Sequence, residues 1–247
     1  MSEFIVVTQK PAGVTFDMAG GDFDLEMESL GSINAKIIEV DAKNEDEFIK
    51  SAKNADAIIA RGRVITKKII DSLNNCKVIA LGSVGADTVD VKAATERSIP
   101  VTHVPDVFIE EVGDHTMMLL LSTFRRLTIM HNYSINGRWS EGRPLLSNYP
   151  RLMGQTLGFV SFGHVARATA VRAKAFGLRM LAYDPYIEEI NMTRYDVEPV
   201  GLFELLEKSD IVSMHAPSTP ETHHMFTYKH FESMKRTSLF INNGRGP

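Results

Sequence analysis

Short apolar runs rich in β-branched residues alternate with amphipathic segments over the first hundred residues. The runs read FIVVT at 4–8, AKIIEV at 35–40, DAIIA at 56–60, KVIAL at 77–81 and IPVTHV at 99–104. Between them, segments such as NEDEFIKSAKN at 44–54 and TKKIIDSLNN at 66–75 have helical spacing. Strands that alternate with helices in this rhythm are typical of a parallel sheet covered by helices.

The rhythm changes after Pro105, where a long helical pattern begins near Phe108 and continues to about Asn136. The Asn136-Gly137 pair is a typical helix stop. The polar, proline-containing stretch at 137–154 should then form an exposed, loop-rich arm. A second series of strands and helices follows, with strand-like runs LGFVSF at 157–162, RMLAYD at 179–184, VEPV at 197–200, DIVSMHAP at 210–217 and SLFINN at 238–243.

These patterns predict an α/β protein with two doubly wound parallel-sheet domains of the Rossmann or flavodoxin type. The expected domains cover residues 1–103 and 104–247, and the helix at about 108–136 should link them. Because the second series stops directly after a strand, its sheet is expected to be incomplete at the C-terminal end.

Composition narrows the range of partners. The 247 residues include 27 basic and 31 acidic ones, so the formal net charge of −4 provides no basic field to attract nucleic acid or an anionic membrane. The longest apolar run, MMLLL at 117–121, is far too short to cross a bilayer, and the N-terminus shows no signal-peptide pattern. The lone Cys76 cannot form an internal disulfide. We expect a cytoplasmic protein with a small-molecule partner.

The eight histidines show no metal-ligand spacing. His223 and His224 are adjacent, and we expect their side chains to point apart. No metal site is predicted.

The stretch SFGHVA at 161–166 has the outline of a dinucleotide-binding turn between a strand and a helix. The pattern Gly-x-Gly-x-x-Gly would place glycines at Ser161, Gly163 and Ala166, and only Gly163 is one. Ser161 can take the first position if its φ stays negative, and the pattern itself allows alanine at the third. An ordinary strand-to-helix turn is the alternative, because a degenerate match alone is weak.

An acidic residue at the end of the next strand favours the nucleotide interpretation. Asp184 lies 21 residues after Gly163, close to the spacing at which a carboxylate meets the ribose of an adenine nucleotide. Such a carboxylate accepts hydrogen bonds from ribose hydroxyls and repels a 2′-phosphate, so the pattern predicts NAD rather than NADP. A solvated residue before a proline turn, or an enzyme that binds S-adenosylmethionine, would show the same acid.

Polar residues also follow the later strands, and they should reach the same crevice, because ligands collect at the carboxyl ends of parallel strands. They are His215, Pro217, Thr222, Asn243 and Arg245. The guanidinium of Arg245 could form paired hydrogen bonds with a carboxylate or a carbonyl oxygen. In the first domain, LGSVGADTVD at 81–90 offers accessible amides for an anion, although a plain turn before a helix near Asp90 would look the same.

Together these stretches resemble the NAD-dependent D-isomer-specific 2-hydroxyacid dehydrogenases, over most of the chain from about Asp56 onward. The most specific pieces are DTVDVKAATERSIPVTHVP, IEEVGDHTMMLLL, RLMGQTLGFVSFGHVARATAVRAKAFGLRMLAYDPY, DIVSMHAPSTPETHHMF and FINNGRGP. The resemblance implies a substrate-binding first domain and an NAD-binding second domain. It also implies an oxidoreductase that transfers a hydride between NAD(H) and a small D-2-hydroxy acid or 2-oxo acid.

The resemblance assigns roles to individual residues. Arg245 matches the catalytic arginine, while Arg61 and the backbone amides of Val84 and Gly85 match the part that holds the substrate. The matching cofactor residues are Ser161, Gly163, His164, Val165, Asp184, Pro185, His215, Pro217, Thr222, Asn243 and Gly244.

The resemblance further implies a general-acid histidine and a glutamate partner that follow the Asn-x-x-Arg-Gly segment, beyond Pro247. We therefore expect the working enzyme to have a C-terminal part that this sequence lacks. A catalytically dead truncated homologue, acting as a nucleotide-binding or interaction module, is the alternative. In the family the long helix and the following arm pair two subunits, so a homodimer through the segment from Trp139 to Pro150 is expected.

Overall fold

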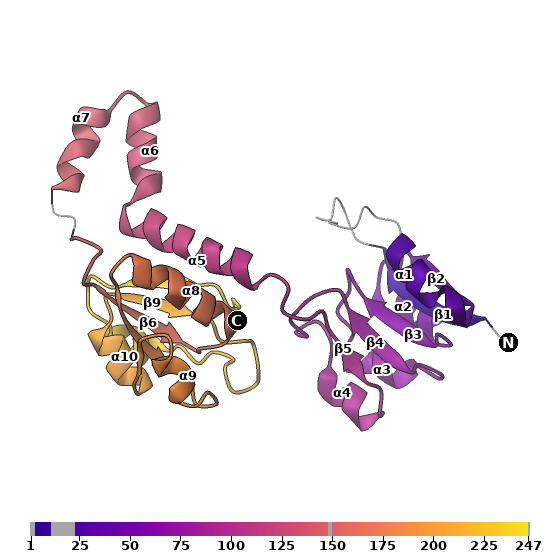
Figure 1. The fold of residues 1–247 in the computed structure, drawn as a ribbon. Coiled ribbons are helices and arrows are strands. Elements are labelled where there is room, and N and C mark those ends of the chain that lie inside the picture. The colour runs from indigo at the N-terminus through magenta and orange to yellow at the C-terminus, as the bar shows by residue number, and fades with distance from the viewer. Residues whose placement is uncertain (1–2, 11–22, 148–149, 247) are drawn as a thin grey trace. The chain divides into compact units, whose positions relative to one another are not determined.

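The computed structural model describes residues 3–10, 23–147 and 150–246. The chain divides into two compact units, Met1–Val107 and Phe108–Pro247 (Figure 1). Each unit holds one five-stranded sheet whose paired strands are all parallel. The predicted α/β class with two parallel sheets is confirmed. In the described part of the chain, no helix is long and apolar enough to cross a membrane.

The sheet of the first unit has the strand order β2-β1-β3-β4-β5. Its strands are β1 (Phe4–Gln9), β2 (Ala35–Val40), β3 (Ala57–Ala60), β4 (Val78–Leu81) and β5 (Val101–Thr102). The helical elements are α1 (Asp24–Leu30), the 3₁₀ turn η1 (Gly31–Ile33), α2 (Glu45–Ala52), α3 (Lys67–Ser72) and α4 (Val91–Glu96).

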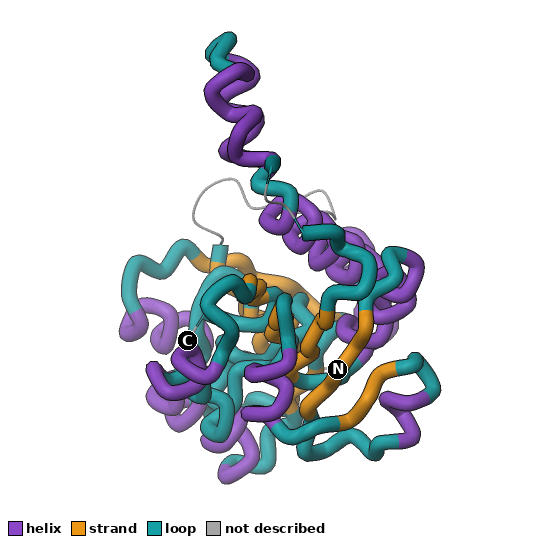
Figure 2. The backbone as a smooth tube through the Cα atoms, turned by 90° about the vertical axis from the view of Figure 1, so that its left-hand side faces the viewer, coloured by secondary structure: helices purple, strands orange, loops and turns teal. Residues whose placement is uncertain are grey.

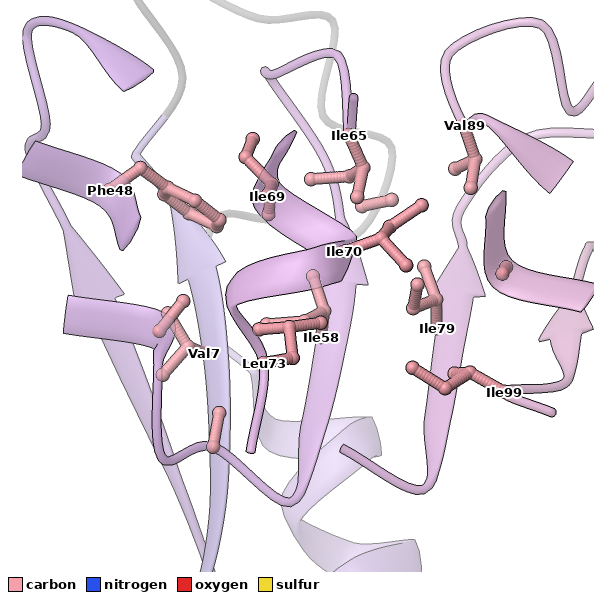
Figure 3. Close-up of a cluster of buried hydrophobic side chains, with 14 of the residues drawn as sticks. Val7, Phe48, Ile58, Ile65, Ile69, Ile70, Leu73, Ile79, Val89 and Ile99 are labelled. Atoms are coloured by element: carbon pink, nitrogen blue, oxygen red, sulfur yellow. The ribbon is translucent and has the colours of Figure 1, made fainter. Parts of the chain in front are cut away.

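Aliphatic and aromatic side chains hold the first sheet and its helices together. Phe48 of α2, Ile69 of α3 and Ile58 of β3 are fully buried in one cluster (Figure 3). Polar caps fix where the helices begin: the Thr66 hydroxyl accepts a hydrogen bond from the Ile69 amide at the start of α3. The carboxyl ends of β3 and β4 are thereby held at one edge of the sheet, because neighbouring parallel strands end together.

The sheet of the second unit has the strand order β10-β9-β6-β7-β8. Its strands are β6 (Thr156–Val160), β7 (Arg179–Tyr183), β8 (Val197–Pro199), β9 (Ile211–Met214) and β10 (Leu239–Asn242). The chain leaves β6 toward β7 on one side and later returns to β9 on the other. The carboxyl end of β6 is therefore the switch point at which doubly wound sheets bind their ligands.

Helices cover both faces of this second sheet: α5 (Ile109–Phe124) and α8 (His164–Ala175) on one, and α10 (Leu202–Lys208) on the other. The short helices α9 (Ile190–Thr193) and α11 (Tyr228–Ser233) complete the unit. Because β6 is buried along its whole length, its side chains serve both faces: Phe159 packs under α5 and α8, and Val160 packs with Leu205 of α10.

The helix predicted at about 108–136 is broken, so that part of the prediction is wrong. It forms two helices, α5 and α6 (Leu127–Ile135), separated by Arg126 at a left-handed φ of +50°. The apolar face of α5 packs on the sheet as far as Phe124, whereas α6 buries only Met130. A straight continuation would have no sheet left to cover, and the chain turns away instead.

Half of the described residues in the stretch expected as a loop-rich arm are helical, which corrects that expectation in part. It contains α7 (Trp139–Gly142) and the 3₁₀ turn η2 (Arg143–Leu146), while residues 148–149 lie outside the described part. Helices α6 and α7 lie side by side and project from the body of the second unit (Figures 1 and 2). We call residues 127–147 the arm.

Candidate functional site

The loop that joins β6 to α8 makes a sharp turn at Ser161. The Ser161 amide donates to the Tyr183 carbonyl oxygen at 2.8 Å, which ties the turn to the end of β7. Its φ is +72°, so the negative φ on which serine was to take the first position of the pattern is not what the structure shows. The chain reverses here between a buried strand and a helix, and it does so in the left-handed conformation that glycine usually supplies.

Gly163 stands at the N-terminus of α8 in an extended conformation, with φ −73° and ψ −166°. A Cβ atom at this position would meet nothing within 4 Å, so the space in front of the helix is open. His164 and Val165 follow in the first helical turn, whose amides have no partner within the helix. Ala166 is fully buried against the sheet. An open space before the positive end of a helix fits a pyrophosphate.

Asp184, at the end of β7, is joined to this turn. Its Oδ2 accepts hydrogen bonds from the Ser161 hydroxyl at 3.0 Å and the Phe162 amide at 2.9 Å. Its Oδ1 accepts one from the Tyr186 amide at 2.9 Å, across the exposed Pro185. The sequence predicted that the turn and the acid would lie together, and the structure joins them directly.

A pocket of about 390 Å³ opens beside the Asp184 carboxylate. Apolar side chains of Ile187, Met192 and Val200 form part of its wall, and Glu189 and Glu204 add two further acidic groups without a basic one. Its volume lies in the range of small-molecule sites. Apolar walls suit a purine ring, and the acidic groups disfavour an additional phosphate.

His215 and Thr222 follow β9, on the other side of the switch point. Burial lowers the pKa of His215 to about 4, so its imidazole is neutral at neutral pH. Its Nε2 lies 2.8 Å from the Ser213 hydroxyl. The Thr222 hydroxyl donates to the Pro217 carbonyl oxygen at 2.5 Å and accepts from the Thr219 amide at 2.8 Å. The Thr222 hydroxyl is therefore used to hold the loop from Pro217 to Thr222 together.

The segment after β10, which carries Arg245, is held by the side chains of Asn242 and Asn243. Asn242 accepts from the Gly244 amide at 2.9 Å through Oδ1 and donates to the Arg245 carbonyl oxygen at 2.7 Å through Nδ2. The Asn243 amide nitrogen Nδ2 donates to the hydroxyl of buried Thr116 in α5 at 2.8 Å. A Cβ atom on Gly244 would lie 2.6 Å from the Ala216 carbonyl oxygen, so this position requires glycine. Arg245 itself is exposed.

Sequence reasoning missed Asn242 and Thr116 as parts of this segment. Asn242 is three residues before Arg245, a spacing that could have suggested hydrogen bonds from its side chain to the backbone of this segment. Thr116 gave no signal, because a threonine on the apolar face of a helix looks like an ordinary packed residue.

In the first unit, the loops after β3 and β4 run side by side. The Ile65 amide donates to the Thr88 carbonyl oxygen at 2.7 Å, which brings the segment with Arg61 next to the segment with Val84 and Gly85. Within the described residues, the Val84 and Gly85 amides donate to no other group. The Asp90 carboxylate caps α4, so the alternative of a helix-capping turn also holds for part of this loop.

The adjacent histidines depart from expectation. The rings of His223 and His224 stack with centroids 3.8 Å apart rather than pointing apart, because His224 has a left-handed φ of +54° that turns its side chain back. In residues 3–10, 23–147 and 150–246, no group of three or more His, Cys, Asp or Glu residues is arranged to hold a metal ion.

The chain matches known proteins over most of its length. Residues 117–247 match the family described as D-isomer specific 2-hydroxyacid dehydrogenase, NAD binding domain. A glyoxylate reductase from Thermofilum pendens is 37% identical over 216 residues, covering 83% of this chain and 61% of that protein. A hydroxypyruvate reductase from Thermotoga maritima is 32% identical over 217 residues, covering 87% and 69%.

A solved structure agrees with these matches. The D-lactate dehydrogenase from Aquifex aeolicus, complexed with NAD and lactic acid, superposes with a TM-score of 0.82 at 27% identity, covering 98% of this chain and 69% of that one. The chain spans about three fifths of the length of the first curated relatives that it matches.

Proposed function

The chain belongs to the family of D-isomer specific 2-hydroxyacid dehydrogenases. From this premise we propose that it is part of an oxidoreductase that acts on a small D-2-hydroxy acid or 2-oxo acid with NAD(H). One observation carries the proposal: the Ser161 hydroxyl and the Phe162 amide donate hydrogen bonds to the Asp184 carboxylate at the switch point of the second sheet. When bound, NAD supplies or accepts the hydride.

The protein's own part at the nucleotide is binding and orientation. Gly163 and the first turn of α8 would hold the pyrophosphate, and Asp184 would bind the ribose. The pocket beside Asp184 would hold the adenine ring, with Pro185 at its rim. His164, Val165, His215, Pro217, Thr222, Asn243 and Gly244 would line the remainder of the cofactor site.

At the substrate, Arg245 would orient the 2-oxo acid by donating hydrogen bonds to its carboxylate and carbonyl oxygens. Such charge-assisted bonds are worth about 1.5–3 kcal/mol each, or roughly 10- to 150-fold in binding or rate. The two hydrogen bonds of the Asn242 side chain to the Gly244 and Arg245 backbone support this role, because they fix the backbone from which the guanidinium extends. In the first unit, Arg61 and the Val84 and Gly85 amides would bind the substrate carboxylate.

The proposal is tested first by cofactor binding and then by turnover. NADH should bind to the chain more tightly than NADPH, measured by the fluorescence of the reduced nicotinamide. Turnover is followed by NADH oxidation with glyoxylate, hydroxypyruvate or pyruvate, in the protein that includes the expected C-terminal part. In that protein Arg245→Ala should keep NADH affinity and lose turnover. Arg236→Ala, an exposed arginine just before β10, is the matched control. A chain that binds no NADH, or turnover that survives Arg245→Ala, would contradict the proposal.

We further infer that a second copy of the chain packs on the arm. Large apolar side chains there are exposed although they face no core: Leu127 by 56%, Ile129 by 47%, Ile135 by 65% and Trp139 by 50%. Apolar surface grouped in this way favours association. Light scattering should give the mass of a dimer, and Ile135→Asp should give a monomer. A monomeric parent chain at micromolar concentration would refute the homodimer.

A cytoplasmic location belongs to the same proposal. Burial raises the pKa of the Cys76 thiol, which therefore stays protonated and unreactive. A sequence with a single shielded cysteine fits a reducing compartment. Fractionation of cells that produce the protein should recover it with cytoplasmic markers.

A further inference from the structure

Ser161 combines two features that no other described residue of the turn shares. It is one of six described non-glycine residues with a positive φ, the others being Asn34, Ser98, Arg126, Asp196 and His224. Its hydroxyl also donates to the Asp184 carboxylate. An L-residue is strained in the left-handed region, and glycine would adopt it without strain. A strained side chain kept at the entrance of a ligand site points to a task for that side chain.

The hydrogen bonds around Asp184 suggest what the task is. A carboxylate has about four acceptor positions on its two oxygens. The Ser161 hydroxyl and the Phe162 amide occupy the two on Oδ2, and the Tyr186 amide occupies one on Oδ1. The remaining position, on Oδ1, is open to a ligand. The turn thereby fixes the rotation of the carboxylate and decides which oxygen meets a ribose hydroxyl.

The same bonds leave few hydrogen-bond donors for a phosphate. A 2′-phosphate needs hydrogen-bond donors, and the Ser161 hydroxyl has a single proton, which it gives to Asp184. The Phe162 and Tyr186 amides are likewise engaged by this carboxylate.

We propose that Ser161 is a positioning residue for the ribose of the nucleotide, acting through Asp184 rather than on the pyrophosphate. The proposal rests on the proposed NAD-binding function and names a residue that determines recognition of the unphosphorylated ribose. Ser161 thus takes the place of a glycine at a cost in backbone strain, and in return it holds the carboxylate in the orientation that accepts from a diol.

Fluorescence titration of the full chain with NADH and with NADPH tests this role. Ser161→Gly and Ser161→Ala should each weaken NADH binding about 5- to 10-fold, the size expected for one net hydrogen bond, and should change NADPH binding less than about twofold. In the Asp184→Ala background, which removes both acceptor oxygens, Ser161→Gly should change the NADH dissociation constant by less than about twofold, because the hydroxyl acts through the carboxylate.

Ser98→Gly is the matched control, since Ser98 also has a left-handed φ, of +54°, and lies at the end of α4 in the other unit. It should leave NADH binding unchanged. The inference is overturned if both Ser161 variants bind NADH within twofold of the parent chain. It is also overturned if Ser161→Gly causes an equal loss when Asp184 is already alanine. A parent chain that binds no NADH overturns the proposed function itself, so the two failures are distinguishable.

Discussion

Replacing Asp184 by asparagine should remove most of the discrimination between NADH and NADPH. The substitution keeps the shape of the side chain and one acceptor oxygen. In the place of Oδ2 this oxygen still accepts from the Ser161 hydroxyl and the Phe162 amide, two of the three protein donors. What it removes is one negative charge beside the ribose. Any change in selectivity can therefore be assigned to charge rather than to a collapsed turn.

The magnitude follows from the distance and the exposure of the carboxylate. Two unit charges about 4 Å apart at an effective dielectric constant of about 20 repel by roughly 4 kcal/mol, which is an upper limit for a 2′-phosphate at this site. Asp184 is half-buried, so solvent reduces this value, and we expect roughly 1–2 kcal/mol, or about 5- to 30-fold tighter NADPH binding. NADH should lose about one charged hydrogen bond, roughly tenfold. Some preference for NADH should remain, because Glu189 and Glu204 still line the pocket.

The assay is a pair of fluorescence titrations, with NADH and with NADPH, at low and at high salt. The NADPH part of the change should shrink at high salt, because mobile ions screen the repulsion within about 10 Å at 0.1 M and about 3 Å at 1 M. Glu207→Gln is the control: it removes the same charge from α10, at a residue that does not line the pocket. A ratio of the two dissociation constants that shifts less than threefold in Asp184→Asn, or equally in Glu207→Gln, would refute the reasoning.

Three further predictions concern stability. Gly158→Ala in β6 should lower the thermal midpoint by several degrees in circular dichroism, since the new Cβ would lie 2.5 Å from Leu205 Cδ2 and overpacking costs about 1–3 kcal/mol; an unchanged midpoint would contradict this packing. Thr116→Val should cost about 1–2 kcal/mol more in urea unfolding than Thr169→Val, because only the former leaves a partly buried amide donor without its acceptor; equal costs would argue against the contact. His215 should titrate near pH 4 by NMR in the folded chain and near its ordinary value of 6.5 in the unfolded one, so its contribution to stability is complete above pH 6.5 and is lost as the pH falls to 4; a folded midpoint near 6.5 would refute it.

The parallel sheets could be predicted from the sequence because their signal is local. Runs such as DAIIA and KVIAL are continuous, apolar and β-branched, and strands buried on both faces require this composition. The run IPVTHV, by contrast, pairs only at Val101 and Thr102, since β5 lies at the edge of the sheet and has a neighbour on one side alone. The helix break at Arg126 could not be predicted either. The helical pattern continues through it, and what ends α5 is the end of the sheet beneath it.

In the candidate site, too, some features could be predicted from the sequence and others could not. Gly163 and Asp184 were predicted from spacing, because a strand, a turn and a helix place them at one edge of the sheet whatever the other residues are. The left-handed φ of Ser161 and its bond to Asp184 depend on how closely two loops approach each other, which spacing does not determine. The contact between Asn243 and Thr116 spans 127 positions in the sequence, and only the packing of α5 on the sheet creates it.

Two of the loops of the second unit that carry ligand-binding candidates are held by side chains that need not touch a ligand. The Ser161 hydroxyl fixes Asp184, and Thr116 fixes the segment that leads to Arg245 through Asn243. A loop already held in its binding conformation loses less entropy when a ligand arrives, so more of the contact energy becomes affinity. Selectivity then depends on residues behind the contact surface as well as on those that form it. Substitutions of these side chains should therefore change nucleotide or substrate affinity while the charges that face the ligand stay the same.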